Sequence, residues 1–260
     1  MDSSRFTRYL ALGDSMSIDL YPALDAGEVD VAVALERVAF AGRVAPLGAA
    51  SLLYQNAEER WPEHMGDDLA SLLPGISYMN VAADGATIGD VFGEQLDAVE
   101  ASDEPVLVTL TVGSTDLWSV AAAKTRRAVL AQIGKDVVGA YNLLLDALRE
   151  RLPAATIVLT TICDPSDRSG RVAGMRDGAP LPLELLDVVN AHLRSLASRS
   201  PSVLVADAYA HFLGHGVSDA EGERWYWRRS PAELNARGAS ELRDLWLATA
   251  RGAGGRLYSG

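Results

Sequence analysis

The chain has 260 residues, with 35 acidic and 23 basic side chains and a formal net charge of −12. Hydrophobic residues make up 48% and charged residues 22%, a composition typical of globular rather than disordered proteins. The acidic balance argues against a nucleic-acid partner, because binding to phosphates depends on lysine and arginine. The single cysteine, Cys163, excludes an internal disulfide and a zinc site built from cysteines.

Five short apolar runs rich in β-branched residues predict buried strands. Such runs need no polar alternation, because strands of a parallel sheet are covered on both faces. The predicted strands are Tyr9–Leu12, Ile76–Val81, Val106–Val112, Thr156–Ile162 and Val203–Ala206.

Helical patterns lie between these runs, with apolar residues at spacings of three and four. The predicted helices are Glu59–Leu73, Ala128–Leu152, Leu183–Ser198 and Ser240–Ala250. Strands that alternate with helices in this way predict an α/β protein with an open parallel sheet and helices on both faces.

The simplest organisation is one domain over residues 1–260, because no repeat or flexible linker interrupts the pattern. Two segments are too long for ordinary connections between a strand and a helix. They are a long insertion at about 16–56 and the loop Asp164–Pro182. Each follows the carboxyl end of a strand, where open α/β sheets place their ligand sites. Both are therefore candidate walls of a substrate site.

Four short motifs follow the predicted strands or precede the last helix: Gly13-Asp14-Ser15, Asn80 to Thr87 with Gly85 near its centre, Gly113-Ser114-Thr115-Asp116, and Ser230 to Asn235. In this order the chain resembles the SGNH (GDSL-type) hydrolase family over nearly its whole length. The resemblance implies a flavodoxin-like three-layer αβα fold with a five-stranded parallel sheet. It also implies ester or acyl hydrolysis, or acyl transfer. A cytoplasmic location would favour a small acylated metabolite as the substrate.

The resemblance makes Ser15 the nucleophile and assigns the backbone N–H groups of Ser15 and Gly85 to the oxyanion hole. Preorganised donors of this kind stabilise the negative charge of a tetrahedral intermediate. Asp14, Asp116 and Trp118 stand beside these positions and are predicted to border the site. Where the family usually has an asparagine donor in the third motif, this chain has Thr115.

The last motif departs further from the family pattern, because Glu233 stands at the position of the usual histidine base and Ser230 at that of its aspartate. Glu233 can itself act as the base if burial raises its pKa. His211 or His215, two of only four histidines, could instead supply the imidazole, although packing roles are the commoner use of such loop residues. The remaining alternatives are a non-hydrolytic cyclase or lyase that uses Glu233 for acid-base chemistry, and a ligand-binding pseudoenzyme.

The aromatic and basic run from Trp225 to Arg229 precedes the last motif, and Arg228 is predicted to contact substrate or to pack at the sheet edge. No cofactor and no metal site is expected. Residues 1–7 lack the pattern of a secretory signal, and no apolar stretch approaches the length of a membrane span. We therefore expect a cytoplasmic protein with a small-molecule substrate and neither a nucleic-acid nor a membrane partner.

Overall fold

A five-stranded parallel sheet forms the centre of the computed structural model, which describes residues 5–27, 44–121, 127–172, 180–252 and 257. The order across the sheet is β2-β1-β3-β4-β5. The strands are β1 (Arg8–Gly13), β2 (Ser77–Asn80), β3 (Val106–Thr111), β4 (Thr156–Thr160) and β5 (Val203–Ala206). All five predicted strands are confirmed. Strand order reverses at β1, so the carboxyl ends of β1, β2 and β3 lie together at the edge where such folds bind ligands.

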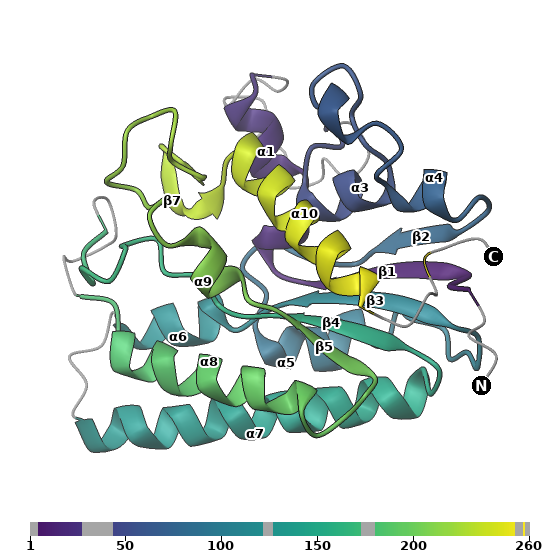
Figure 1. The fold of residues 1–260 in the computed structure, drawn as a ribbon. Coiled ribbons are helices and arrows are strands. Elements are labelled where there is room, and N and C mark those ends of the chain that lie inside the picture. Colours follow the sequence, from purple (N-terminus) through teal and green to yellow (C-terminus); the bar gives the residue numbers. More distant parts are fainter. Residues whose placement is uncertain (1–4, 28–43, 122–126, 173–179, 253–256, 258–260) are drawn as a thin grey trace.

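Helices cover both faces of the sheet, which confirms the three-layer α/β prediction (Figure 1). One apolar cluster joins the sheet to α5 (Ile88–Asp90), the π-helical turn η3 (Val91–Gln95), α6 (Ser114–Ala121), α7 (Arg127–Arg151) and α8 (Leu183–Ala197). A second cluster joins the other face to α3 (Ala49–Tyr54), α4 (Leu69–Leu72) and α10 (Ala236–Arg251). The predicted helices that correspond to α7, α8 and α10 are therefore confirmed.

The predicted helix over Glu59–Leu73 is wrong. The structure has a short 3₁₀ turn, η2 (Pro62–His64), and then the separate helix α4. Pro62 provides no backbone donor for a continuous helix, and Gly66 has a φ of +80°, which breaks the helical path. Met65 is 65% exposed, so the apolar spacing that suggested the helix did not reflect one buried face.

The segment at about 16–56 contributes to the layer that covers the sheet. It contains η1 (Ser15–Ser17), α1 (Leu20–Asp25) and α3, while residues 28–43 lie outside the described part of the chain. Asp19 joins its two ends by accepting hydrogen bonds from Gly48 N (2.7 Å) and Ser51 Oγ (3.0 Å). Since α3 packs against α10, the described ends of this segment belong to the packed fold.

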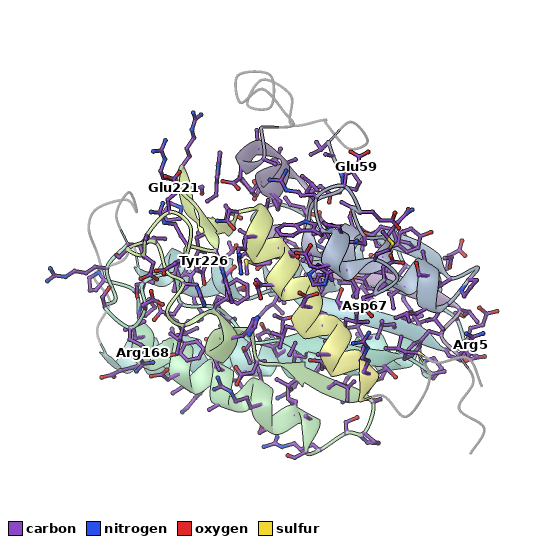
Figure 2. All side chains as sticks on the ribbon, turned by 45° about the horizontal axis from the view of Figure 1, so that its top comes forward. Arg5, Glu59, Asp67, Arg168, Glu221 and Tyr226 are labelled. Carbon is purple, nitrogen blue, oxygen red and sulfur yellow. The ribbon has the colours of Figure 1, made fainter. Side chains whose placement is uncertain are left out.

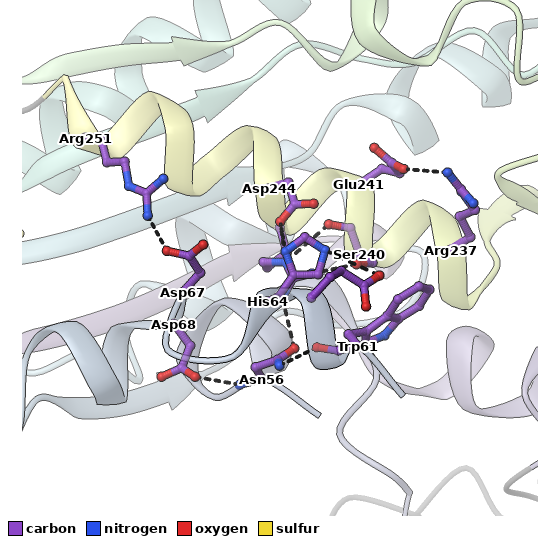
Figure 3. A network of polar contacts seen from close by, with 12 residues as sticks. Asn56, Trp61, His64, Asp67, Asp68, Arg237, Ser240, Glu241, Asp244 and Arg251 are labelled. Atoms are coloured by element: carbon purple, nitrogen blue, oxygen red, sulfur yellow. Dashed lines mark hydrogen bonds and ion pairs between the residues drawn. The ribbon is translucent and has the colours of Figure 1, made fainter. Parts of the chain in front are cut away.

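A fully buried arginine, Arg243, connects α10 to the segment after α3. Figure 3 shows its partners Asn56, Ser240 and Asp244 close together between these two parts of the chain. Arg243 pairs with Asp244 (2.7 Å) and donates to Asn56 Oδ1 (3.1 Å) and Ser240 Oγ (2.6 Å). His64 also contacts Asp244, at 3.3 Å. A buried cation needs such partners because removal from water is costly, so this network holds one helical layer together.

Candidate active site

Ser15 begins the short helix η1 immediately after β1 and is 9% exposed. Gly13, just before it, has a φ of +127°, and a Cβ there would lie 1.6 Å from the carbonyl oxygen of Thr111. Only glycine fits this turn. The buried amide of Gln95 holds the turn from both sides, since it accepts from Gly13 N and donates to Gly13 O, each at 2.8 Å. Sequence reasoning missed Gln95, which no motif marked.

Hydrogen bonds join the first three motifs into one structure. Asp14 caps η1 by accepting from Met16 N (3.2 Å) and also accepts from Ser114 Oγ (2.8 Å). The second motif is linked to the first by a bond from Ala83 N to Gly13 O (3.0 Å). Asp116 links the third motif to the second by accepting from Ile88 N (3.1 Å). Asp14 and Asp116 therefore position the predicted site residues.

Three candidate oxyanion donors have no hydrogen-bond partner within the described residues: the backbone N–H groups of Ser15 and Gly85 and the hydroxyl of Thr115. Ser15 N and Thr115 lie in the first turns of η1 and α6, where amide groups lack partners within the helix. Gly85 has a φ of +67°, and nothing lies within 4 Å of the position of a Cβ there. The space beside this turn is therefore open.

Glu233 reaches Ser15 from a small antiparallel hairpin formed by β6 (Tyr226–Trp227) and β7 (Ser230–Leu234). Strand β7 packs against η1. Burial raises the pKa of Glu233 to about 7, the hydrogen bond from Ser15 lowers it, and the negative charges of Asp84 and Asp14 raise it further. One carboxylate oxygen, Oε2, is buried without a partner of ordinary hydrogen-bond geometry among the described residues. The structure thus brings two of the predicted catalytic residues together.

Asp84 is a neighbour of Glu233 that sequence reasoning did not single out. It accepts a hydrogen bond from Tyr21 Oη at 2.9 Å. Tyr21 in turn packs at 5.7 Å from the ring of Trp227 on the hairpin. Tyr21 comes from the 16–56 segment, so no local motif could have indicated this contact.

The two candidate histidines have other partners. His211 Nε2 lies 3.5 Å from Glu241 Oε2, and its ring is 5.1 Å from that of Trp225. His215 stacks on the same tryptophan at 3.6 Å and donates from Nδ1 to the carbonyl of Glu223 (2.7 Å). Within the described part of the chain, neither histidine ring contacts Ser15, whereas Glu233 does.

The remaining predicted site residues differ in placement. Trp118 lines a pocket together with Asp14, and its role at the site stays a prediction. Arg228 is exposed in the turn between β6 and β7, and it stays a predicted substrate contact. The described residues contain no cluster of histidine, cysteine or carboxylate side chains suited to hold a metal ion.

A family model for the GDSL-like lipase/acylhydrolase family matches residues 39–238. The chain belongs to this family. The family comprises lipases and acylhydrolases, so this family member is a hydrolase of the lipase and esterase type. A search of curated proteins finds no significant match.

Solved structures of other proteins have the same fold at low sequence identity. Phospholipase A1 from Streptomyces albidoflavus has a TM-score of 0.57 and 20% identity, over 94% of this chain and 99% of that one. An extracellular lipase from Streptomyces rimosus has a TM-score of 0.54 and 20% identity, over 95% of this chain and 99% of that one. The acetyl xylan esterase AlAXEase has a TM-score of 0.56 and 16% identity, over 93% of this chain and 98% of that one. Likeness at this level of identity supports the fold alone.

No described helix of this family member is long and apolar enough to cross a membrane.

Proposed function

We propose that this protein hydrolyses esters of small acylated molecules, with Ser15 as nucleophile and Glu233 as general base. The observation that carries the proposal is the contact between the Ser15 hydroxyl and a buried carboxyl group whose pKa is raised to about 7. A base works best when its pKa lies near the working pH, since it is then both ionised and basic enough to take a proton. An ordinary exposed glutamate would be too weak a base.

In the proposed reaction, Glu233 takes the Ser15 proton as the hydroxyl oxygen attacks the ester carbonyl. Negative charge develops on the carbonyl oxygen, and the free N–H groups of Ser15 and Gly85, with the Thr115 hydroxyl, are the donors available to stabilise it. The protonated Glu233 then gives its proton to the departing alcohol. Water then attacks the acyl carbonyl while Glu233 takes its proton. The bond between the acyl group and Ser15 breaks, Glu233 returns the proton to the serine oxygen, and the carboxylic acid leaves.

Sequence composition and family resemblance support three further parts of the proposal. These are a small acylated substrate, a cytoplasmic location, and water rather than another molecule as the acyl acceptor. Asp84 and Asp14, together with Glu233, make the surroundings of the proposed nucleophile acidic. We therefore expect neutral or cationic esters to be better substrates than anionic ones.

The test compares Ser15→Ala and Glu233→Gln with His211→Ala and His215→Ala on p-nitrophenyl acetate and butyrate. We expect Ser15→Ala to lose hydrolysis and fluorophosphonate labelling, and Glu233→Gln to lower kcat by about 100-fold or more. Both histidine variants should retain wild-type rates. Full hydrolysis by Ser15→Ala would overturn the assignment of Ser15 as the nucleophile. Loss of activity in a histidine variant, together with an unchanged rate in Glu233→Gln, would overturn the assignment of Glu233 as the base.

A further inference from the structure

A pocket adjoins the Ser15–Glu233 pair at the carboxyl edge of the sheet. It is lined by Asp14 and Met16, which flank Ser15 in the chain, and by Ala232, which precedes Glu233. Trp118 and Ile162 contribute apolar surface to its walls. A group held in this pocket is therefore next to the residues that would carry out the reaction.

The hydroxyl of Tyr226 is the unusual group in this pocket. Tyr226 comes from β6 (Figure 2). It lines the pocket and is only 1% exposed. Its hydroxyl oxygen is buried without a well-formed hydrogen bond to any described residue. The thiol of Cys163 is its hydrogen-bonding neighbour, but a thiol is a weak acceptor. A buried hydroxyl without a good partner is costly, so such a group is expected to serve a ligand.

The other hydroxyl groups of the pocket already have protein partners. The pairs are Thr111 with Ser17, Ser114 with Asp14, Thr160 with Trp246 and Thr161 with Asp207. Thr160 accepts its bond and keeps its own proton, whereas the Tyr226 hydroxyl is, among the described pocket residues, the one buried hydroxyl without a well-formed hydrogen bond. A ligand that enters would gain its hydrogen bond there.

The surroundings restrict the chemistry of this ligand. The Asp14 carboxyl group lines the same pocket, so a negatively charged ligand group would be repelled. The walls of Trp118, Ile162 and Met16 favour a short, mainly apolar chain. A neutral ether, hydroxyl or carbonyl oxygen on such a chain meets both conditions and can accept the tyrosine proton.

We propose that this pocket binds the acyl group of the substrate and that the Tyr226 hydroxyl selects acyl chains that carry a neutral oxygen acceptor. This inference rests on the proposed ester hydrolysis and specifies its substrate class as oxygen-substituted short acyl esters. Tyr226 acts in it as a specificity residue and takes no part in proton transfer.

The test measures kcat/KM for p-nitrophenyl methoxyacetate and 3-methoxypropionate against the esters of the same length without the ether, butyrate and pentanoate. The ratio of ether to alkyl ester is then compared between the wild-type protein and Tyr226→Phe, because this comparison cancels the intrinsic reactivity of each ester. We expect the ratio for at least one pair to fall about tenfold in Tyr226→Phe, the effect of one lost hydrogen bond. An unchanged ratio for both pairs would overturn the inference.

Tyr209→Phe is the matched control, because the Tyr209 hydroxyl is bound by Arg168 and does not line the pocket. It should leave both ratios unchanged. Thermal unfolding supplies a second readout: Tyr226→Phe should unfold at the same temperature as wild type or higher, since it removes a hydroxyl without a partner. A lower unfolding temperature would show that the protein itself satisfies this hydroxyl, which contradicts a binding role.

A binding measurement separates this inference from the proposed function. Saturation-transfer NMR on Ser15→Ala protein compares methoxyacetamide and 3-methoxypropionamide with butyramide and pentanamide, which cannot be hydrolysed as esters. Stronger binding of an ether amide, lost on adding Tyr226→Phe, supports the pocket even if Ser15 proves not to be the nucleophile. Ester hydrolysis that depends on Ser15, without any such preference, overturns the pocket assignment alone.

Discussion

The Ser15 hydroxyl contacts the Glu233 carboxylate although the two residues lie near opposite ends of the chain. Ser15 is held by the turn after β1, and Glu233 is held by the β6-β7 hairpin. Burial keeps the carboxyl pKa near neutrality, and the serine contact opposes part of that rise. This pairing places a carboxylate where the chain lacks the family's usual histidine.

The pH dependence of hydrolysis should report the ionisation of Glu233. Activity should rise with pH through about 7 in the wild-type protein, because only the ionised carboxylate can take the Ser15 proton. Asp84→Asn removes a negative charge that raises the pKa of Glu233, so the rise should move to lower pH. The measurement is kcat/KM against pH. The control is Asp97→Asn, which changes an exposed carboxyl group that pairs with Arg151. It should leave the pH at which activity rises unchanged.

The stability of the fold should depend on the same group. Because the pKa of Glu233 is about 7 in the folded protein and about 4.5 otherwise, the folded state binds more protons between these pH values. Stability therefore falls as pH rises through this window. Glu233→Gln should be more stable than wild type at pH 8 by on the order of 2 to 3 kcal/mol, and the difference should vanish near pH 4.5. Urea unfolding at both pH values measures the difference in stability between Glu233→Gln and wild type. An equal difference at pH 8 and pH 4.5 would contradict the prediction.

The Thr115 hydroxyl should act only in the transition state. Thr115→Val removes this candidate donor at nearly constant shape and should lower kcat on the order of 100-fold with little change in KM. The hydroxyl has no partner among the described residues, so its removal should leave the unfolding temperature unchanged. Steady-state kinetics and thermal unfolding of the purified variant check both parts. A large loss of stability with normal kcat would instead indicate a structural residue.

The buried arginine of α10 should matter far more for stability than an exposed one on the same helix. Arg243→Met leaves the half-buried Asp244 without its closest cation and should cost about 3 to 5 kcal/mol. Arg251→Met removes the exposed pair with Asp67 and should cost less than about 1 kcal/mol. Urea unfolding of the two variants gives the comparison. Similar losses in both would refute the role assigned to the buried network.

Local sequence predicted the sheet well because its strands are continuous apolar runs, buried whatever their neighbours. It predicted α7 and α8 because each has one regular apolar face. It failed over residues 59–73, where Pro62 and Gly66 outweigh a helical spacing of apolar residues. The motifs around Ser15, Gly85 and Thr115 could be located because they follow directly on strands whose carboxyl ends must share one edge.

The sequence by itself predicted the parallel sheet, the family, and a glutamate at the position of the family's usual histidine base. Only the tertiary structure decided that Glu233, rather than His211 or His215, contacts Ser15, since these choices depend on how the β6-β7 hairpin packs against η1. The tertiary structure alone also showed the buried environment that raises the Glu233 pKa, and a Tyr226 hydroxyl without a well-formed hydrogen bond to any described residue. Burial and hydrogen-bond satisfaction arise from contacts between segments that are far apart in the chain, and no local pattern encodes them.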